Sequence, residues 1–401
     1  MVGMVARPTK VGAVGSFHTL ILSLSLCFIS LSQFSVRATF GAYVAIFLLA
    51  IFRSPRLLGQ MNGVVGGGMY LILITAAAFV FSAFHDIYFN SFIKFFLLQI
   101  YVVLLYWMVR ARILSMETIA NACKLLIYVH VTFFLVQLGY YIVSGNFIDF
   151  DSYVRETAAD SLYESKALND SIIPIRAVGL FSEPSFYAMT VVPAGVIVLL
   201  KQRKMSLAVL LAFGTAFLSF SIAAIAITAL ILLIHMAFGR VSMRLKVAVV
   251  VAAVLCTPPL YTIYDKRVNQ SVDYNAVDSR TAVFDELRVR DPMETLFGNG
   301  VFWDENNTVG KTQLVGYQVR DSSFYVYVVF GTGLVGATLF FGFLLFLFRK
   351  KTARKYFIYL FPILLFKYFV LSGFLWPMLM FFYLLGKEPV PPQNRVLSLG
   401  G

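Results

Sequence analysis

Apolar residues run along this chain in long blocks that are separated by short polar stretches. A helix needs roughly 20 apolar residues to cross the hydrocarbon of a bilayer. The blocks predict twelve membrane helices at 11–34, 38–52, 63–84, 87–109, 119–144, 179–200, 205–219, 221–238, 245–264, 322–348, 356–371 and 374–385. The first block lacks a small-residue cleavage site before the next, so we expect a retained helix and not a signal peptide.

The composition agrees with this pattern. The 401 residues have a mean hydropathy of +0.81, with 59% hydrophobic and 13% charged residues, whereas soluble globular domains are about a quarter charged. We therefore predict an all-α polytopic membrane protein that forms a single integral membrane domain over residues 1–401. Little chain remains for a large soluble domain.

Lys and Arg set the expected orientation, because they concentrate in cytoplasmic loops. With both termini cytoplasmic, 20 of the 33 basic residues fall inside, against two acids, Glu117 and Glu388. The net charge of +13 then follows from topology. We expect contact with anionic membrane lipids and no nucleic-acid partner.

Two predicted extracytoplasmic loops, 145–178 and 265–321, hold most of the polar chemistry. Long loops on a rigid frame are common places for function. Within the second loop, residues 280–290 have helical character and stop before Pro292, which predicts a short helix at the outer membrane face.

Glu183 lies before Pro184 at the outer end of the sixth predicted helix, in the stretch Gly-Leu-Phe-Ser-Glu-Pro-Ser. A carboxylate at this depth is costly unless it is paired or faces water. Pro184 favours an extended conformation for Glu183, which predicts a carboxylate at a helix start facing a cavity. A helix cap with an incidental glutamate is the alternative.

Arginines mark the second loop. Arg280 and Arg288 are eight residues apart, so on a helix they could border one cleft, while Arg290 points to nearly the opposite face from Arg288. Guanidinium groups near the headgroup plane suit bidentate phosphate recognition. A solvated, charged helix is the alternative.

The tenth predicted helix begins with Arg320-Asp321-Ser-Ser-Phe and continues into a glycine-rich run, Gly331-Thr-Gly333-Leu-Val-Gly336. The glycines allow close helix approach in a membrane. Arg320 and Asp321 are either site residues or interfacial anchors that reach towards water.

Metal binding is not expected. The three cysteines lie in or beside apolar runs, and no two of the four histidines have ligand spacing. Asp149-Phe-Asp151 forms an Asp-x-Asp pattern, for which an acidic loop is the favoured interpretation. We predict no metal and no cofactor.

The ordered set of these segments resembles the bacterial O-antigen polymerase (Wzy) family, within the wider polymerase and ligase superfamily. The resemblance covers about residues 170 to 340: Arg176 with Gly-Leu-Phe-Ser-Glu-Pro-Ser, Ser-Arg280-Thr leading to Leu-Phe-Gly-Asn-Gly, and Asp-Ser-Ser-Phe entering a glycine-rich helix. Arg320 and Gly331 also resemble an Arg-x10-Gly pattern of some of these polymerases. Phe-Leu-Ser-Phe-Ser-Ile222 departs from it, because many relatives have an arginine after the serine.

The resemblance implies a GT-C-like glycosyltransferase in a bacterial inner membrane with a periplasmic active site. It would move a growing glycan from undecaprenyl diphosphate onto the non-reducing end of an incoming lipid-linked repeat unit, in lipopolysaccharide biosynthesis, with a chain-length regulator protein as a further partner. The attacking hydroxyl needs a base, for which Glu183 is the candidate and Asp321 the second choice. The diphosphate candidates are Arg176, Arg280, Arg288 and Arg320.

Two alternatives remain open. O-antigen ligases, which transfer glycan to the lipid A core, carry a histidine at the entry to the helix after the large outer loop, where this chain has Arg320-Asp321-Ser-Ser. A polysaccharide transporter or a flippase for lipid-linked oligosaccharide would place ionisable residues near the membrane midplane. Away from their ends, the predicted membrane runs contain only Lys94 and Lys367 as charges.

Overall fold

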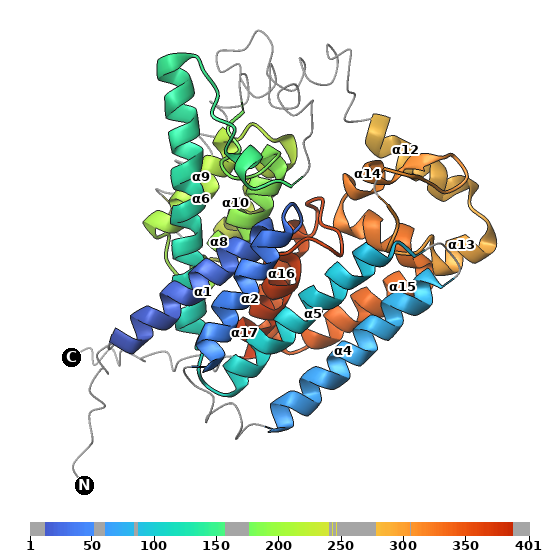
Figure 1. Cartoon of the computed structure of the whole chain (residues 1–401), viewed down its shortest axis with the longest axis horizontal. Helices are drawn as coiled ribbons and strands as arrows, with labels where there is room; N and C mark the ends of the chain where they lie inside the picture. Colours follow the sequence, from blue (N-terminus) through green and yellow to red (C-terminus); the bar gives the residue numbers. More distant parts are fainter. Residues whose placement is uncertain are drawn as a thin grey trace.

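The computed structural model describes residues 13–51, 61–83, 87–156, 176–239, 278–304 and 306–387, together with Met243 and Lys246 (Figure 1). These residues form fourteen α-helices, a 3₁₀ turn and one two-stranded hairpin. The long helices are α1 (Ala13–Leu31), α2 (Val36–Ile51), α4 (Met61–Ser82), α5 (Phe89–Arg110), α6 (Met116–Ser144), α8 (Pro184–Gln202), α9 (Leu207–Leu218), α10 (Ile222–Phe238), α15 (Phe324–Leu347), α16 (Lys351–Ile363) and α17 (Leu375–Lys387).

Eleven of the twelve predicted membrane helices correspond to these eleven helices. The ninth, 245–264, lies outside the described residues apart from Lys246. By length and composition, five of the helices are able to cross a membrane, namely α4, α5, α6, α8 and α15. The shorter apolar helices include α2, α9, α10 and α17. This set indicates an all-α, multi-pass membrane protein.

The prediction for 356–371 was too long. Helix α16 ends at Ile363, and the chain then runs without helix until α17 begins at Leu375. Most of this non-helical segment, 364–374, is buried. Irregular backbone is tolerated at membrane depth where protein covers it, and hydropathy alone does not distinguish such a segment from a helix.

Helix α8 is the centre of the fold. Its side chains from Phe186 to Leu199 are buried without interruption, as expected for a helix that is apolar on all sides. Helices α6, α9, α10, α16 and α17 pack around it. Figure 1 shows α8 enclosed by these helices, with α4, α5 and α15 to one side.

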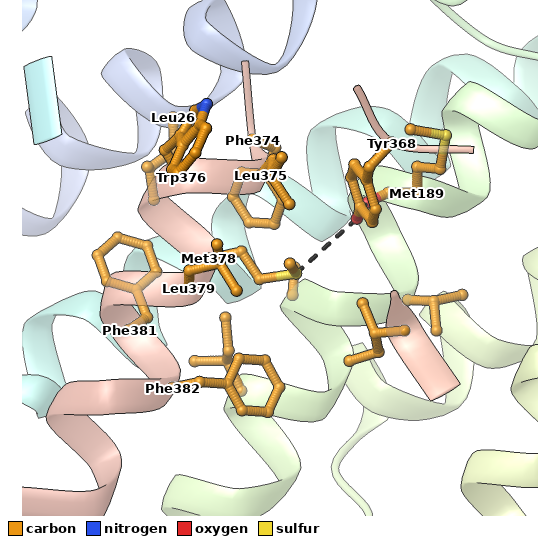
Figure 2. Packing of buried hydrophobic residues seen from close by; sticks show 14 of the residues in the cluster. Leu26, Met189, Tyr368, Phe374, Leu375, Trp376, Met378, Leu379, Phe381 and Phe382 are labelled. Carbon is orange, nitrogen blue, oxygen red and sulfur yellow. Dashed lines mark hydrogen bonds between the residues drawn. The ribbon is translucent and has the colours of Figure 1, made fainter. Parts of the chain in front are cut away.

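Pro193 interrupts the hydrogen bonding of α8 and thereby fixes the non-helical segment. A proline has no N–H, so the carbonyl of the residue four positions earlier, Met189, loses its helical donor. The hydroxyl of Tyr368 donates to this carbonyl. The same hydroxyl lies 3.8 Å from the sulfur of Met378 in α17, and Figure 2 shows the Tyr368 ring between α8 and α17. The segment is therefore anchored on α8 beside the proline.

The loop before α15 is folded. It contains α12 (Asp278–Val289), α13 (Pro292–Phe297), the antiparallel strands β1 (Thr308–Val309) and β2 (Leu314–Val315), and α14 (Gly316–Arg320). The predicted helix at 280–290 is thus confirmed, two residues earlier at its start and one at its end. In Figure 1 these elements gather beyond one end of α15.

Glycines join this loop to α15. Gly333 has a φ of +61°, which breaks the helical conformation inside α15. A Cβ atom at Gly333 would lie 2.4 Å from the carbonyl of Leu296, and one at Gly298 would lie 2.4 Å from the carbonyl of Gly331. Backbone therefore rests on backbone here, which only glycine permits.

Candidate functional site

Glu183 lies at the N-cap of α8 with φ −139° and ψ 152°. The extended conformation that Pro184 predicts is confirmed. Glu183 thus occupies the cap position, but its side chain makes no cap hydrogen bond. Instead, Oε2 lies 2.5 Å from Nζ of Lys367 and accepts a hydrogen bond of 3.1 Å from the hydroxyl of Ser185.

Asp321 lies between α14 and α15, three residues before Phe324. Its Oδ1 is 3.0 Å from Nζ of Lys367 and 3.4 Å from Nε of Arg320. Burial raises the pKa of Asp321, but the charges and hydrogen bonds of Lys367 and Arg320 together lower it further, so the pKa lies below its ordinary value. The carboxylate is therefore ionised at neutral pH.

Lys367 joins the two carboxylates, and it was not among the candidate site residues. Its side chain is 7% exposed, and its ammonium lies 4.2 Å from the ring centroid of Phe186. A lysine inside an apolar run is costly unless it has a partner, so its presence was the available signal. The partner could not be read from the sequence, since Glu183 is 184 residues away.

Hydrogen bonds at both neighbours of Lys367 hold the segment that carries its ammonium. The carbonyl of Phe366 accepts a hydrogen bond of 3.0 Å from the N–H of Phe324, in the first turn of α15. The hydroxyl of Tyr368 binds the carbonyl of Met189 in α8. The segment therefore bridges the start of α15 and the middle of α8, and Lys367 lies between Asp321, which precedes α15, and Glu183, which precedes α8.

A pocket of about 200 Å³ opens beside this cluster, and we call it the charged pocket. Its lining comes from five parts of the chain: Ser185, Ala223, Phe284, Asp321, Ser322, Ser323, Val326, Leu365, Phe366 and Lys367. Three helices, α8, α10 and α15, begin at this wall. Helix N-termini carry partial positive charge and orient N–H groups towards anions. These N-termini and Lys367 supply positive charge at the pocket, and the carboxylate of Asp321 supplies negative charge.

The four candidate arginines are placed differently. Arg320 is beside Asp321, and its guanidinium carbon lies 5.8 Å from the ring centroid of Phe186. Arg176 is buried. Arg288 is 78% exposed and pairs with Asp285 at 3.2 Å, and it is not among the described lining residues of the charged pocket.

Arg280 occupies the first turn of α12, four residues before Phe284, and its side chain lies outside the described residues. Phe284 lines the charged pocket. Residues four apart share one face of a helix. The backbone of Arg280 is therefore one turn from the pocket wall.

Arg290 contacts α15 instead of the charged pocket. It donates a hydrogen bond of 3.2 Å to the carbonyl of Phe330, and its guanidinium lies 4.1 Å from the ring centroid of the same residue. Burial lowers the pKa of Arg290 to about 10, against the raising effect of Glu286 and Glu294. We therefore assign Arg290 a structural role against α15.

Glu286 supports the same loop from inside. Its side chain is buried and accepts hydrogen bonds from the N–H groups of Lys311 and Thr312, at 2.9 and 2.6 Å, and from the Thr312 hydroxyl at 2.6 Å. Burial raises the pKa of Glu286, but these hydrogen bonds lower it by more. The hairpin is thereby fastened to α12, which steadies the helix that carries Phe284.

The Asp-x-Asp pattern has a local partner. Arg155 lies 2.7 Å from Asp151 and 3.8 Å from Asp149. In the part of the chain that the structure describes, no three His, Cys, Asp or Glu side chains are grouped so as to hold a metal ion. The interpretation of this pattern as an acidic loop thus gains a specific ion pair.

No protein-family model matches this chain, and no curated protein matches it either. The chemistry of the site is therefore inferred from the side chains described above.

Proposed function

We propose that this chain is a membrane glycosyltransferase of the O-antigen polymerase type. It moves a growing glycan from undecaprenyl diphosphate onto the non-reducing end sugar of an incoming lipid-linked repeat unit. One observation carries the proposal: Glu183, before α8, and Asp321, before α15, share the ammonium of Lys367 beside a pocket where three helices begin. The ordered motifs that resemble this family lie on the same elements.

The reaction requires a base and a place for departing charge. The acceptor hydroxyl loses its proton as its oxygen attacks the anomeric carbon, and the bond from that carbon to the diphosphate breaks. Glu183 has one cationic partner and Asp321 has two. The extra cation makes Asp321 the weaker base, so we assign proton removal to Glu183.

The leaving diphosphate gains negative charge, which positive groups stabilise. Lys367, Arg320 and the starts of α8, α10 and α15 supply such charge at the charged pocket. We include Arg280 in this set and place Arg176 and Arg288 second. In this proposal the reaction proceeds without a metal.

We further propose a GT-C-like fold of about twelve membrane helices in a bacterial inner membrane, with cytoplasmic termini and a periplasmic charged pocket. The loop that precedes α15 carries acidic residues, while the α15–α16 connection is basic, which supports this orientation. A cysteine at Asn306 should react with an impermeant maleimide in intact spheroplasts, and one at Lys351 should not. The reverse labelling would invert the orientation.

Extension of a defined lipid-linked repeat unit by the purified chain in proteoliposomes is the direct test. We expect a ladder of glycans on a gel, and an Arg280→Ala variant with little or no polymer. Arg280→Lys should recover little, because an ammonium lacks the planar fork of a guanidinium. Arg290→Ala should lower thermal stability first, through the lost contact with Phe330.

Other products would replace the proposal. Transfer of glycan to lipid A core, without a ladder, would assign the chain to ligases. Movement of the lipid-linked unit across the bilayer, without any glycan extension, would make it a flippase.

A further inference from the structure

A second pocket, of about 470 Å³, lies where α15 meets α16, and it is separate from the charged pocket. We call it the arginine groove; its lining is Leu345, Phe348, Arg349, Arg354, Phe357 and Ile358. Four of these side chains are apolar and two are cationic. We propose that the arginine groove binds an anionic phospholipid of the surrounding membrane, with the phosphate at the arginines and an acyl chain along the apolar wall.

The charged residues around the groove are all basic. Residues 349–355 contain five basic residues and no acid. In the described part of the chain no acidic side chain forms an ion pair with Arg349 or Arg354, and both side chains are exposed. A phosphate diester supplies the missing negative charge, and an arginine can bind it through two parallel hydrogen bonds.

The start of α16 adds to this excess of positive charge. The helix has no acidic residue in its first turn, and the side chain of its N-cap residue, Lys350, makes no cap hydrogen bond. A helix N-terminus already carries partial positive charge, so nearby cations are unfavourable there. An anion between Arg354 and this N-terminus would relieve the repulsion.

The apolar wall argues for a lipid over a soluble phosphate. Phe348 is buried, and its ring centroid is 5.7 Å from that of Phe357. Leu345 is half exposed beside them. Arg349 lies 4.2 Å over the ring of Phe346, which holds its guanidinium at the rim. A free phosphate ion would make no favourable contact with this apolar surface, whereas an acyl chain would cover it.

Binding can be measured on the full chain in detergent, with phosphatidylglycerol and phosphatidylcholine of equal acyl chains as probes. We expect native mass spectrometry to show retained phosphatidylglycerol only. At about 1 kcal/mol per basic residue near a lipid headgroup, Arg349→Gln with Arg354→Gln should weaken binding on the order of 30-fold. A matched pair, Arg110→Gln with Lys204→Gln, removes the same charge at two exposed positions outside the groove and should leave binding near normal.

Equal loss in both pairs would overturn the proposal in favour of diffuse attraction to the membrane. Glycerol phosphate that binds as tightly as the lipid would overturn the lipid assignment. A measurement on the unaltered chain guards against misfolded variants: a photoactivatable phosphatidylglycerol should crosslink to residues 343–358. Crosslinks spread over all helices would also sink the idea.

Discussion

Two clusters in this molecule each place two carboxylates around one cation, and they differ in sequence separation and exposure and in the second cation, Arg320, that lies beside Asp321 in the first. In the first, Lys367 contacts Glu183 and Asp321 across sequence separations of 184 and 46 residues. In the second, Arg155 contacts Asp149 and Asp151, which are six and four residues earlier in the chain.

The two clusters differ in the conformational entropy lost when they form and in their exposure to open space. Arg155 and Asp151 close a single turn next to the 3₁₀ turn Phe150–Tyr153, and Asp151 is fully buried. The Lys367 cluster requires three distant segments to be ordered together, which is entropically costly. It also leaves Glu183 28% exposed beside a pocket. The Lys367 cluster is therefore a better candidate for a catalytic site than the Arg155 cluster.

Replacement of Lys367 should have the largest effect. Lys367→Gln leaves Glu183 and Asp321 facing each other without their shared cation. Removal of one partner from a buried ion pair typically costs about 3–5 kcal/mol, so we expect a lower melting temperature together with lost extension. Lys94→Gln is the matched control, since Lys94 is the other lysine inside a membrane run but is exposed. Similar losses of melting temperature and extension in both variants would contradict a specific role of Lys367 in this cluster.

Glu183→Gln comes next. It retains the size and most hydrogen bonding but removes the proton acceptor, so turnover should fall by about 10²- to 10⁴-fold while the protein stays folded and binds the lipid diphosphate. Melting temperature, lipid binding and polymer length should be measured on one preparation. A stability loss that accompanies the activity loss would indicate a purely structural pairing. Near-normal polymer would move the role of base to Asp321.

Tyr368→Phe tests how the Lys367 cluster is held in place. The variant leaves the carbonyl of Met189 without its donor, and an unsatisfied buried carbonyl costs about 1–3 kcal/mol. We expect a lower unfolding temperature and a partial loss of extension. Tyr325→Phe removes a comparable hydroxyl-to-carbonyl bond, to Phe361 at 2.9 Å, at a more exposed place, and should cost less. Unchanged stability in Tyr368→Phe would contradict the anchoring of the segment on α8.

Asp149→Asn should have the smallest effect. The carboxylate is 39% exposed and 3.8 Å from Arg155, and exposed pairs contribute about 0–1 kcal/mol. Extension should be normal in the proteoliposome assay. A severe loss of extension in a stable Asp149→Asn variant would restore the Asp-x-Asp pattern as a catalytic or metal-binding candidate.

These clusters also show how far the sequence could lead. Apolar blocks predicted the helices well because burial in lipid demands apolar length wherever a span occurs. The non-helical segment at 364–374 was not predicted, because it is as apolar as a helix and its hydrogen-bond partners come from α8 and α15. Pro184 and the start of α15 drew attention to Glu183 and Asp321 through local signals. Lys367 has no local signal for its partners.

The contact between Gly298, Gly331 and Gly333 has a consequence for how this protein can vary. A clash between two large side chains can be relieved when one of them becomes smaller in a second mutation. Here the atoms that a Cβ at Gly298 or Gly333 would meet belong to the backbone, of Gly331 and Gly333 in the first case and of Leu296 and Phe297 in the second. A side chain added at Gly298 or Gly333 therefore has no compensating substitution across the contact, so second mutations in the facing residues should not rescue variants at these two positions.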